Sequence, residues 1–150
     1  MGRRSEKALA AQSIDAIQAV LEQRALSAAG QALADLAARQ RLRDQARRDH
    51  ENALAAWEAV VTSSGKLDFT LGLSWASEFA ARGIRLKRSE AEVEDAKRQS
   101  DEARACWRQA ASSKERTQSD LYRATKAVRS ERDEARLAEQ ADLACLRAMT

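Results

Sequence analysis

The most regular hydrophobic pattern in the chain lies in its second half. Steps of three and four residues from Phe79 to Met149 reach mostly apolar positions without correction, which is the heptad repeat of a coiled-coil helix. One row of this seam has mainly large residues, and the other is mostly alanine. The large row is Phe79, Leu86, Val93, Ser100, Trp107, Lys114, Leu121, Val128, Ala135, Asp142 and Met149, and the small row is Arg82, Ser89, Ala96, Ala103, Ala110, Thr117, Ala124, Glu131, Ala138 and Cys145. The pattern predicts a helix over about 75–148 that packs closely on a partner helix along its alanine edge.

A less regular pattern predicts another helix over about 5–61. Ile14, Ile17 and Leu21 have the spacing of one helix face. After them the apolar stripe continues better through Ala25, Ala29, Ala32, Leu36, Ala53, Trp57 and Val60. The step from Leu21 to Ala25 therefore predicts a stutter, which locally unwinds the supercoil. Gly65 is predicted to end this helix in a left-handed conformation.

Polar residues interrupt the seam of the second helix. Lys114 and Thr117 lie at its middle, and Glu131 and Asp142 lie nearer its C-terminal end. Such residues weaken the packing but fix the register and orientation of the partner helix.

The segment KLDFTLGLSW, residues 66–75, alternates apolar and polar or small residues as a half-buried strand does. No other segment alternates, so it is either a loop whose second half enters the next helix or a strand that joins a sheet of another protein. We favour a connection over about 62–74, with Gly72 in the turn and Ser74 as N-cap. With Trp57, this connection would form a partly exposed apolar cluster of the kind that marks partner sites. Alternatively, the apolar residues only pack on each other and lock the turn.

The composition supports two long helices in one domain of 150 residues. The chain has no proline, 4% aromatic and 33% charged residues, which is typical of long helices and coiled coils. We predict an all-α fold in which two long helices form an antiparallel coiled-coil hairpin over 1–150. Helices of about 85 and 112 Å do not match in length, so the C-terminal end of the second should overhang or pair with something else. A homodimer that reuses the same seam is the chief alternative.

The sequence lacks the groupings that usually carry catalysis. His50 is predicted to be structural or solvated, and no Cys/His cluster or glycine-rich phosphate loop is present. Cys106 and Cys145 would lie roughly 58 Å apart on one helix, too far for a bridge within the chain. We therefore predict no enzymatic activity, no cofactor and no metal.

Charge and hydropathy restrict the classes of partner. A net charge of +3, with acidic residues throughout, argues against nucleic-acid binding, although ARQRLRDQARR at 38–48 is basic. No apolar run approaches the ~20 residues that span a bilayer, and the N-terminal segment lacks a secretory signal pattern. We predict a cytoplasmic protein without direct membrane insertion.

Taken together, these features resemble the FliJ/YscO family, the central-stalk proteins of flagellar and virulence type III secretion systems. The likeness covers most of the chain and rests on the predicted hairpin, on LSWASEF at the entry to the second helix, on CWRQAASSKERTQSDL within it, and on its charged end RSERDEARLAEQAD. It implies an accessory protein similar to the γ-subunit of rotary ATPases. The helix termini would insert into a hexameric export ATPase, and the connection would face the export-gate protein at the inner membrane. Secretion chaperones are a further implied partner, and the chain would be a monomer.

The resemblance also implies two groups of contact residues. Those matching the gate-facing region, together with the apolar residues of the connection, are Trp57, Leu67, Phe69, Trp75, Phe79 and Leu86. Those matching the end inserted into the ATPase are Arg123, Arg129, Arg132 and Arg136. The family often carries tyrosines before the connection, where this chain offers only Trp57.

Two other functions fit the same pattern. One is a self-associating structural or scaffold coiled coil, which would be a stable dimer at micromolar concentration. The other is a prefoldin-like holdase, which needs two strands per hairpin where this chain offers one. Within the secretion family, departures from the flagellar pattern favour an injectisome protein.

Overall fold

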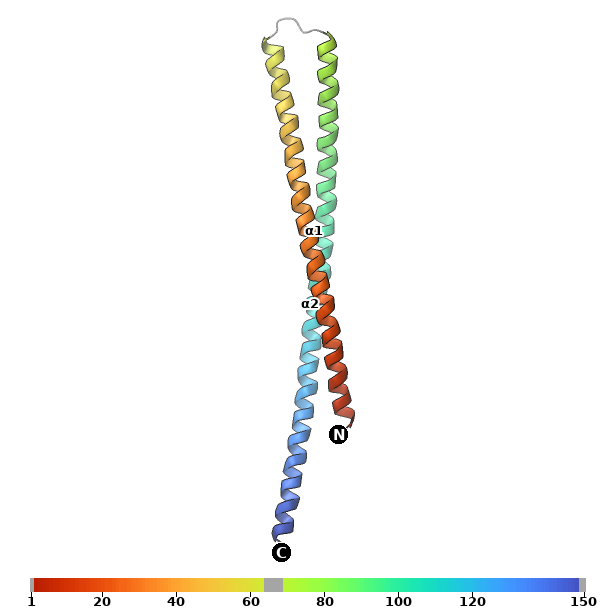
Figure 1. Cartoon of the computed structure of the whole chain (residues 1–150), viewed down its shortest axis with the longest axis vertical. Coiled ribbons are helices and arrows are strands. Elements are labelled where there is room, and N and C mark those ends of the chain that lie inside the picture. The colour runs from red at the N-terminus through yellow and green to blue at the C-terminus, as the bar shows by residue number, and fades with distance from the viewer. Residues whose placement is uncertain (1, 64–68, 149–150) are drawn as a thin grey trace. The chain divides into compact units, whose positions relative to one another are not determined.

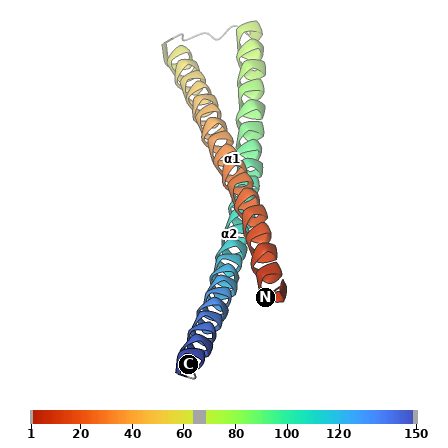
Figure 2. The ribbon, with the colours of Figure 1, turned by 60° about the horizontal axis from the view of Figure 1, so that its bottom comes forward.

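The structure, a computed structural model, describes residues 2–63 and 69–148. They form two helices, α1 (Gly2–Ser63) and α2 (Phe69–Ala148), and no strand occurs among them. The two helices pack against each other and run in opposite directions (Figures 1 and 2). The predicted fold class, two long antiparallel helices, is confirmed.

The chain divides into two compact units, each containing a segment of both helices. Unit 1 combines Met1–Leu26 with Cys106–Thr150, and unit 2 is Ser27–Ala105.

The heptad seam predicted for α2 is confirmed from Phe79 to Ala135. Every position of the two predicted rows in this range is buried or half-buried. The seam also begins one heptad earlier than predicted, because Gly72 and Trp75 face inward as well. After Ala135 the seam positions Ala138, Asp142 and Cys145 are exposed. The C-terminal part of α2 in unit 1 therefore lies beyond the paired region, as the unequal helix lengths predicted.

The core of unit 2 consists of small side chains. Its buried residues are Ala29, Ala46, Ala53, Ser89, Val93, Ala96 and Ser100. Small residues allow two helix axes to come close together. The buried Ser89 hydroxyl donates a hydrogen bond of 2.7 Å to the carbonyl of Leu86, so it needs no partner on α1. Small residues of the predicted alanine row, Ser89 and Ala96, are therefore buried in unit 2, as close packing along that row requires.

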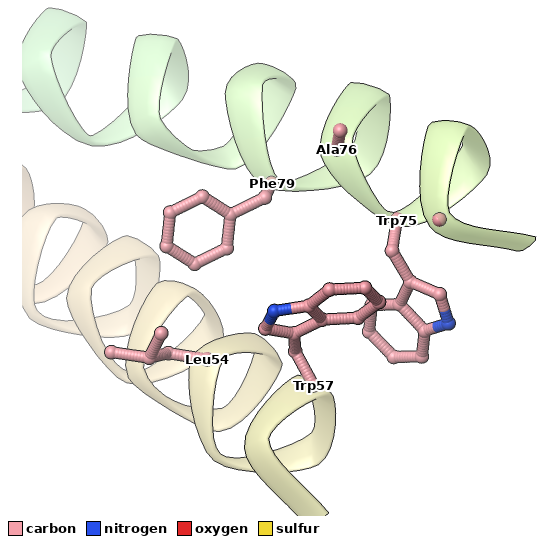
Figure 3. A pocket seen from close by; sticks show the side chains of 6 residues that line it. Leu54, Trp57, Trp75, Ala76 and Phe79 are labelled. Atoms are coloured by element: carbon pink, nitrogen blue, oxygen red, sulfur yellow. The ribbon is translucent and has the colours of Figure 1, made fainter. Parts of the chain in front are cut away.

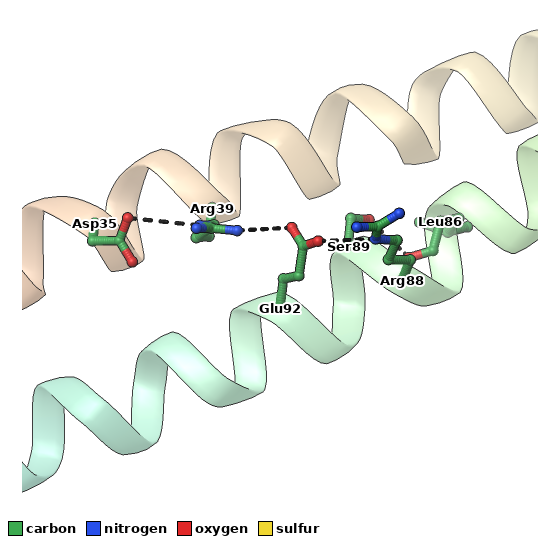
Figure 4. Close-up of polar contacts among 6 residues, drawn as sticks. All are labelled: Asp35, Arg39, Leu86, Arg88, Ser89 and Glu92. Carbon is green, nitrogen blue, oxygen red and sulfur yellow. Dashed lines mark hydrogen bonds and ion pairs between the residues drawn. The ribbon is translucent and has the colours of Figure 1, made fainter.

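Ion pairs border this core in unit 2 (Figure 4). Arg39 Nη1 donates to Glu92 Oε2 at 2.9 Å, and Arg39 Nε lies 3.6 Å from Asp35 Oδ1. Arg88 Nε donates to the second oxygen of Glu92 at 3.2 Å. The hydrogen bond to Glu92, helped by the charge of Asp35, raises the pKa of Arg39 above its ordinary value. These side chains are partly exposed, so the network orients the helices more than it stabilises them.

In unit 1, α1 turns a different face toward α2 than the sequence suggested. Its inward positions are Ala8, Ala11, Asp15, Gln18, Glu22 and Ala25, spaced by three and four residues without interruption. Ile14, Ile17 and Leu21, predicted to face the partner helix, are exposed. The predicted stutter is therefore wrong. The inward positions predicted from Ala25 onward continue toward the N-terminus with the same three-and-four spacing, through the polar residues Glu22, Gln18 and Asp15.

Two polar layers join the helices in unit 1. Lys114 Nζ lies 2.7 Å from Glu22 Oε2, and the Thr117 hydroxyl donates to Asp15 Oδ1 at 3.2 Å. The hydrogen bond and charge of Glu22 raise the pKa of Lys114 above its ordinary value. The polar seam residues of α2 thus meet polar residues of α1, which explains why Asp15 and Glu22 face inward. This matching supports the predicted role of Lys114 and Thr117 in fixing the register.

The connection between the helices differs from the prediction in its second half. Residues 69–74, predicted as loop, are the first residues of α2, so Ser74 is not an N-cap and Gly72 is helical. A helix pairs its backbone groups internally, whereas a lone strand leaves them unpaired. The strand pairing that a prefoldin-like holdase would need is absent from the described residues. Gly65, the predicted helix end, lies outside them.

Candidate functional site

An aromatic pocket lies between α1 and α2 in unit 2 (Figure 3). Its volume is about 230 Å³. The residues that line it are Leu54, Trp57, Gly72, Trp75, Ala76 and Phe79. The rings of Trp57 and Trp75 lie side by side between the helices, with centroids 6.1 Å apart and an interplanar angle of 43°. This lining is almost wholly apolar, so the pocket suits an apolar side chain of a partner.

Helical spacing brings these residues together. On α2, Gly72, Trp75 and Phe79 are separated by three and four residues and continue the heptad seam. On α1, Trp57 follows the buried Ala53 by one turn and reaches across to α2. A Cβ added at Gly72 would meet nothing within 4 Å. The missing side chain at Gly72 therefore leaves open space at the seam, next to the two tryptophans.

Phe79, which lines the pocket, packs against His50 of α1. The His50 ring lies 4.4 Å from that of Phe79, tilted by 38°, and a Cβ at Gly83 would lie 3.7 Å from His50 Cε1. One turn along α2 from Phe79, Arg82 pairs with Glu78 at 2.8 Å and donates to the Asp49 carbonyl at 3.0 Å. His50 thus packs against an aromatic ring, which supports the structural role predicted for it.

Large apolar side chains are exposed on the first turns of α2. Phe69 is 80% exposed, and Leu71 and Leu73 are also exposed. On α1, Val61 is exposed as well. Large apolar residues predicted for this region are therefore exposed among the described residues, whereas Trp57 and Trp75 line the pocket. Exposed large apolar residues in a chain rich in charged residues are a candidate partner site.

Of the predicted gate-facing residues, the structure brings together Trp57, Trp75 and Phe79. Phe69 is exposed outside the pocket lining, Leu86 lies two turns farther along the seam, and Leu67 falls outside the described residues. Sequence reasoning missed Leu54, Gly72 and Ala76 as lining residues. Extending the α2 heptad one repeat upstream of Phe79 would have found Gly72 as a seam position.

The predicted ATPase-facing arginines are all exposed on α2 in unit 1. Arg129, Arg132 and Arg136 are spaced by three and four residues and share one face of the helix. Arg123 lies on another face, 3.8 Å from Asp120. The structure therefore brings three of the four together.

Arg132 also borders a groove between α1 and α2 in unit 1. The groove has a volume of about 600 Å³. Its lining, half apolar and half polar, is Ser5, Ala8, Leu9, Gln12, Asp15, Gln118, Leu121, Tyr122, Thr125, Val128 and Arg132. The Thr125 hydroxyl bonds to the carbonyl of Leu121 in its own helix, so it does not bridge the groove. The groove is more open than the aromatic pocket, and its lining is more polar.

The described residues contain neither a metal-binding cluster nor a bilayer-spanning stretch. No group of three or more His, Cys, Asp or Glu side chains among them is placed to hold a metal ion. Neither helix, over its described length, has a stretch apolar enough to cross a bilayer. Both cysteines, Cys106 and Cys145, are free and exposed.

Comparisons of this chain with protein-family models, with curated proteins and with solved structures find no match. The candidate partner sites therefore stand on geometry and on the sequence resemblance.

Proposed function

We propose that this chain is the central-stalk protein of a type III secretion system, acting in the cytoplasm at the inner-membrane apparatus. In this proposal the unpaired end of α2 enters the hexameric export ATPase, and the aromatic pocket binds the export-gate protein. The observation that carries the proposal is the exposure of α2 after Ala135, where the helix continues without α1 beside it.

The unpaired segment has a pattern suited to insertion into another protein. Leu137, Ala141 and Ala144 are spaced by four and three residues and form a narrow exposed stripe. Charged residues such as Glu134, Glu139 and Arg147 surround it. A single short helix is marginal in water without packing partners, so a surrounding groove or pore would stabilise this segment. A narrow stripe within a charged helix fits a pore whose walls are largely polar.

The arginine face of α2 supports the same placement. Arg129, Arg132 and Arg136 lead along one face into the unpaired segment. Arginine forms bidentate pairs with carboxylates, so this face suits acidic side chains at the entrance of a pore.

The test is co-expression of the full chain with the hexameric ATPase of a type III secretion system. The wild-type chain should co-purify with the ATPase and increase its hexamerisation or its rate of ATP hydrolysis. A triple variant, Arg129→Glu, Arg132→Glu and Arg136→Glu, should lower ATPase binding at least about tenfold, because charge reversal opposes every arginine contact.

The matched control for this experiment changes the same charge elsewhere on α2. Lys87, Lys97 and Arg104 are exposed and belong to unit 2, so replacing all three by glutamate should leave ATPase binding unchanged. Equal losses in both triple variants would show that net charge alone governs binding. Failure of the wild-type chain to bind the ATPase would overturn the proposal.

The role of the pocket is tested separately with the soluble domain of the export-gate protein. Trp75→Ala removes one wall of the pocket, and the variant should bind that domain at least about tenfold more weakly. Ile84→Ser is the control, because Ile84 is an exposed apolar residue that does not line the pocket. Equal binding by the wild type and Trp75→Ala would exclude the pocket as the gate-binding site.

A further inference from the structure

The first helix carries an apolar stripe that faces away from α2 in unit 1. Ile14, Ile17, Val20 and Leu21 are 50%, 59%, 53% and 45% exposed. With Ala16 and Arg24, three of them line an open groove of about 370 Å³ on the surface of the helix. Large apolar residues at spacings of three and four normally face a packing partner. Here that face has none within the described chain.

The stripe is also free of charge along its length. Between Lys7 and Arg24 the only charged residues are Asp15 and Glu22, and both turn inward, toward Thr117 and Lys114. The Ser13 hydroxyl, beside the stripe, already donates to the Leu9 carbonyl at 3.0 Å. The face therefore offers apolar contact without a charge or a hydroxyl that would have to lose its water.

We infer that this stripe binds the same stripe of a second copy of the chain. A two-fold axis would set the two α1 segments antiparallel, so that one surface pairs with itself. Ile14 of one copy would then lie against Ile17 of the second, and Leu21 against Ala10. No charged residue lies at the centre of this contact. At each of its two ends Lys7 of one copy would lie opposite Arg24 of the second, so the like charges there weaken the dimer.

The size of the stripe sets the strength of the dimer. Four side chains of this size, about half exposed, present on the order of 400 Å² per copy, and with their small neighbours the contact buries about 1,000 Å² in total, the lower limit for a specific interface. The dimer is therefore weak, and the chain is mainly monomeric at low micromolar concentration. Each copy keeps its own α1–α2 seam, unlike a dimer in which two chains share the α2 heptads.

Sedimentation equilibrium of the full chain, from about 5 to 500 µM, tests this inference. The wild type should change reversibly from monomer toward dimer across this range. Ile17→Glu should weaken the association at least about tenfold, because two carboxylates enter an apolar contact. A double variant, Ile14→Ser and Ile17→Ser, should weaken it similarly without adding charge. Circular dichroism at 222 nm checks that each variant keeps its helix content.

The control is Ile84→Glu, which places the same change at an isoleucine that is 69% exposed in unit 2. This variant should dimerise like the wild type. A wild-type chain that stays monomeric throughout, or a dimer that Ile17→Glu leaves unchanged, would overturn the inference. The inference does not depend on the proposed function. ATPase binding is tested at Arg129, Arg132 and Arg136, whereas dimerisation is tested at Ile14 and Ile17.

Discussion

The ammonium group of Lys114 lies 2.7 Å from the carboxylate of Glu22, across the seam between α2 and α1. Both residues occupy positions that a coiled coil usually gives to apolar side chains. Their pairing explains how a helix with Ile14, Ile17 and Leu21 on one face presents another face to its partner. The polar layer fixes the register of unit 1 and leaves the apolar face exposed.

This pair should make the stability of the protein depend on alkaline pH. Because the bond to Glu22 raises the pKa of Lys114 in the folded state, its stabilisation is complete below the ordinary lysine pKa and disappears as pH rises through the raised value. The urea midpoint should therefore hold up to about pH 10 and fall above it, as pH passes the ordinary lysine pKa and then the raised one. Lys114→Met, measured by circular dichroism, should show a smaller fall over the same interval. An equal fall in both proteins would assign the pH dependence to other groups.

The two tryptophans of the pocket should stabilise unit 2 together. Trp57→Ala and Trp75→Ala should each lower the free energy of unfolding by about 1–3 kcal/mol, less than for a fully buried tryptophan. In a double-mutant cycle the two changes should show a coupling of about 0.5–1.5 kcal/mol, because the rings lie 6.1 Å apart. Urea unfolding measures both quantities. Strictly additive losses would mean that the rings do not interact in solution.

Substitutions at Gly72 should affect the stability of the chain and its binding of a partner in different ways. Gly72→Ala should stabilise the chain by about 0.5–1 kcal/mol, since alanine favours helix and its Cβ meets nothing within 4 Å. Gly72→Leu should reach into the pocket and weaken binding of any partner that inserts a side chain there. Gly30→Ala is the matched control, because Gly30 is also helical and unhindered but lies outside the pocket. It should gain similar stability, measured by thermal unfolding, without affecting partner binding.

The alanine row of α2 should tolerate larger residues only after the paired region ends. Ala96 is 4% exposed in unit 2, so Ala96→Leu should push the helices apart and cost about 1–3 kcal/mol. Ala138 occupies the same heptad position but is exposed in unit 1, so Ala138→Leu should change stability by no more than about 0.5 kcal/mol. Chemical denaturation of the two variants provides the comparison. A similar cost at both positions would show that Ala138 also packs against a partner helix in solution.

Much of the fold could be predicted because the heptad spacing of α2 continues over many turns without a shift. From Phe79 to Ala135 the residue types alone identify the buried face, and the alanine row predicts close packing. The unequal helix lengths also predicted the exposed end of α2. These features depend on local spacing, which a sequence displays directly.

The seam of α1 could not be predicted in the same way. Hydrophobicity favoured Ile14, Ile17 and Leu21, but the inward face of unit 1 is determined by pairs such as Asp15 with Thr117. Such pairs join residues about one hundred positions apart, so no local pattern shows them. The start of α2 was mispredicted for a related reason. The alternation from Phe69 to Trp75 resembles a strand, but without a partner strand the helix satisfies the backbone better.

Only part of the pocket lining could be predicted from the sequence. Trp57, Trp75 and Phe79 stand out by residue type, whereas Gly72 and Ala76 contribute by lacking side-chain bulk. A sequence shows which residues are large, but open space appears only when the helices are placed together.

The small buried side chains Ala29, Ala46, Ala53, Ser89, Ala96 and Ser100 all lie in unit 2, with Val93, and no described residue of unit 1 is buried to the same degree. Water therefore reaches the backbone of unit 1 more readily, and its amide protons should exchange with deuterium first. Local opening of unit 1 can then expose the inward faces of its two helix segments while unit 2 stays folded. Unit 1 can therefore change its helix packing when a partner binds, while unit 2 stays folded.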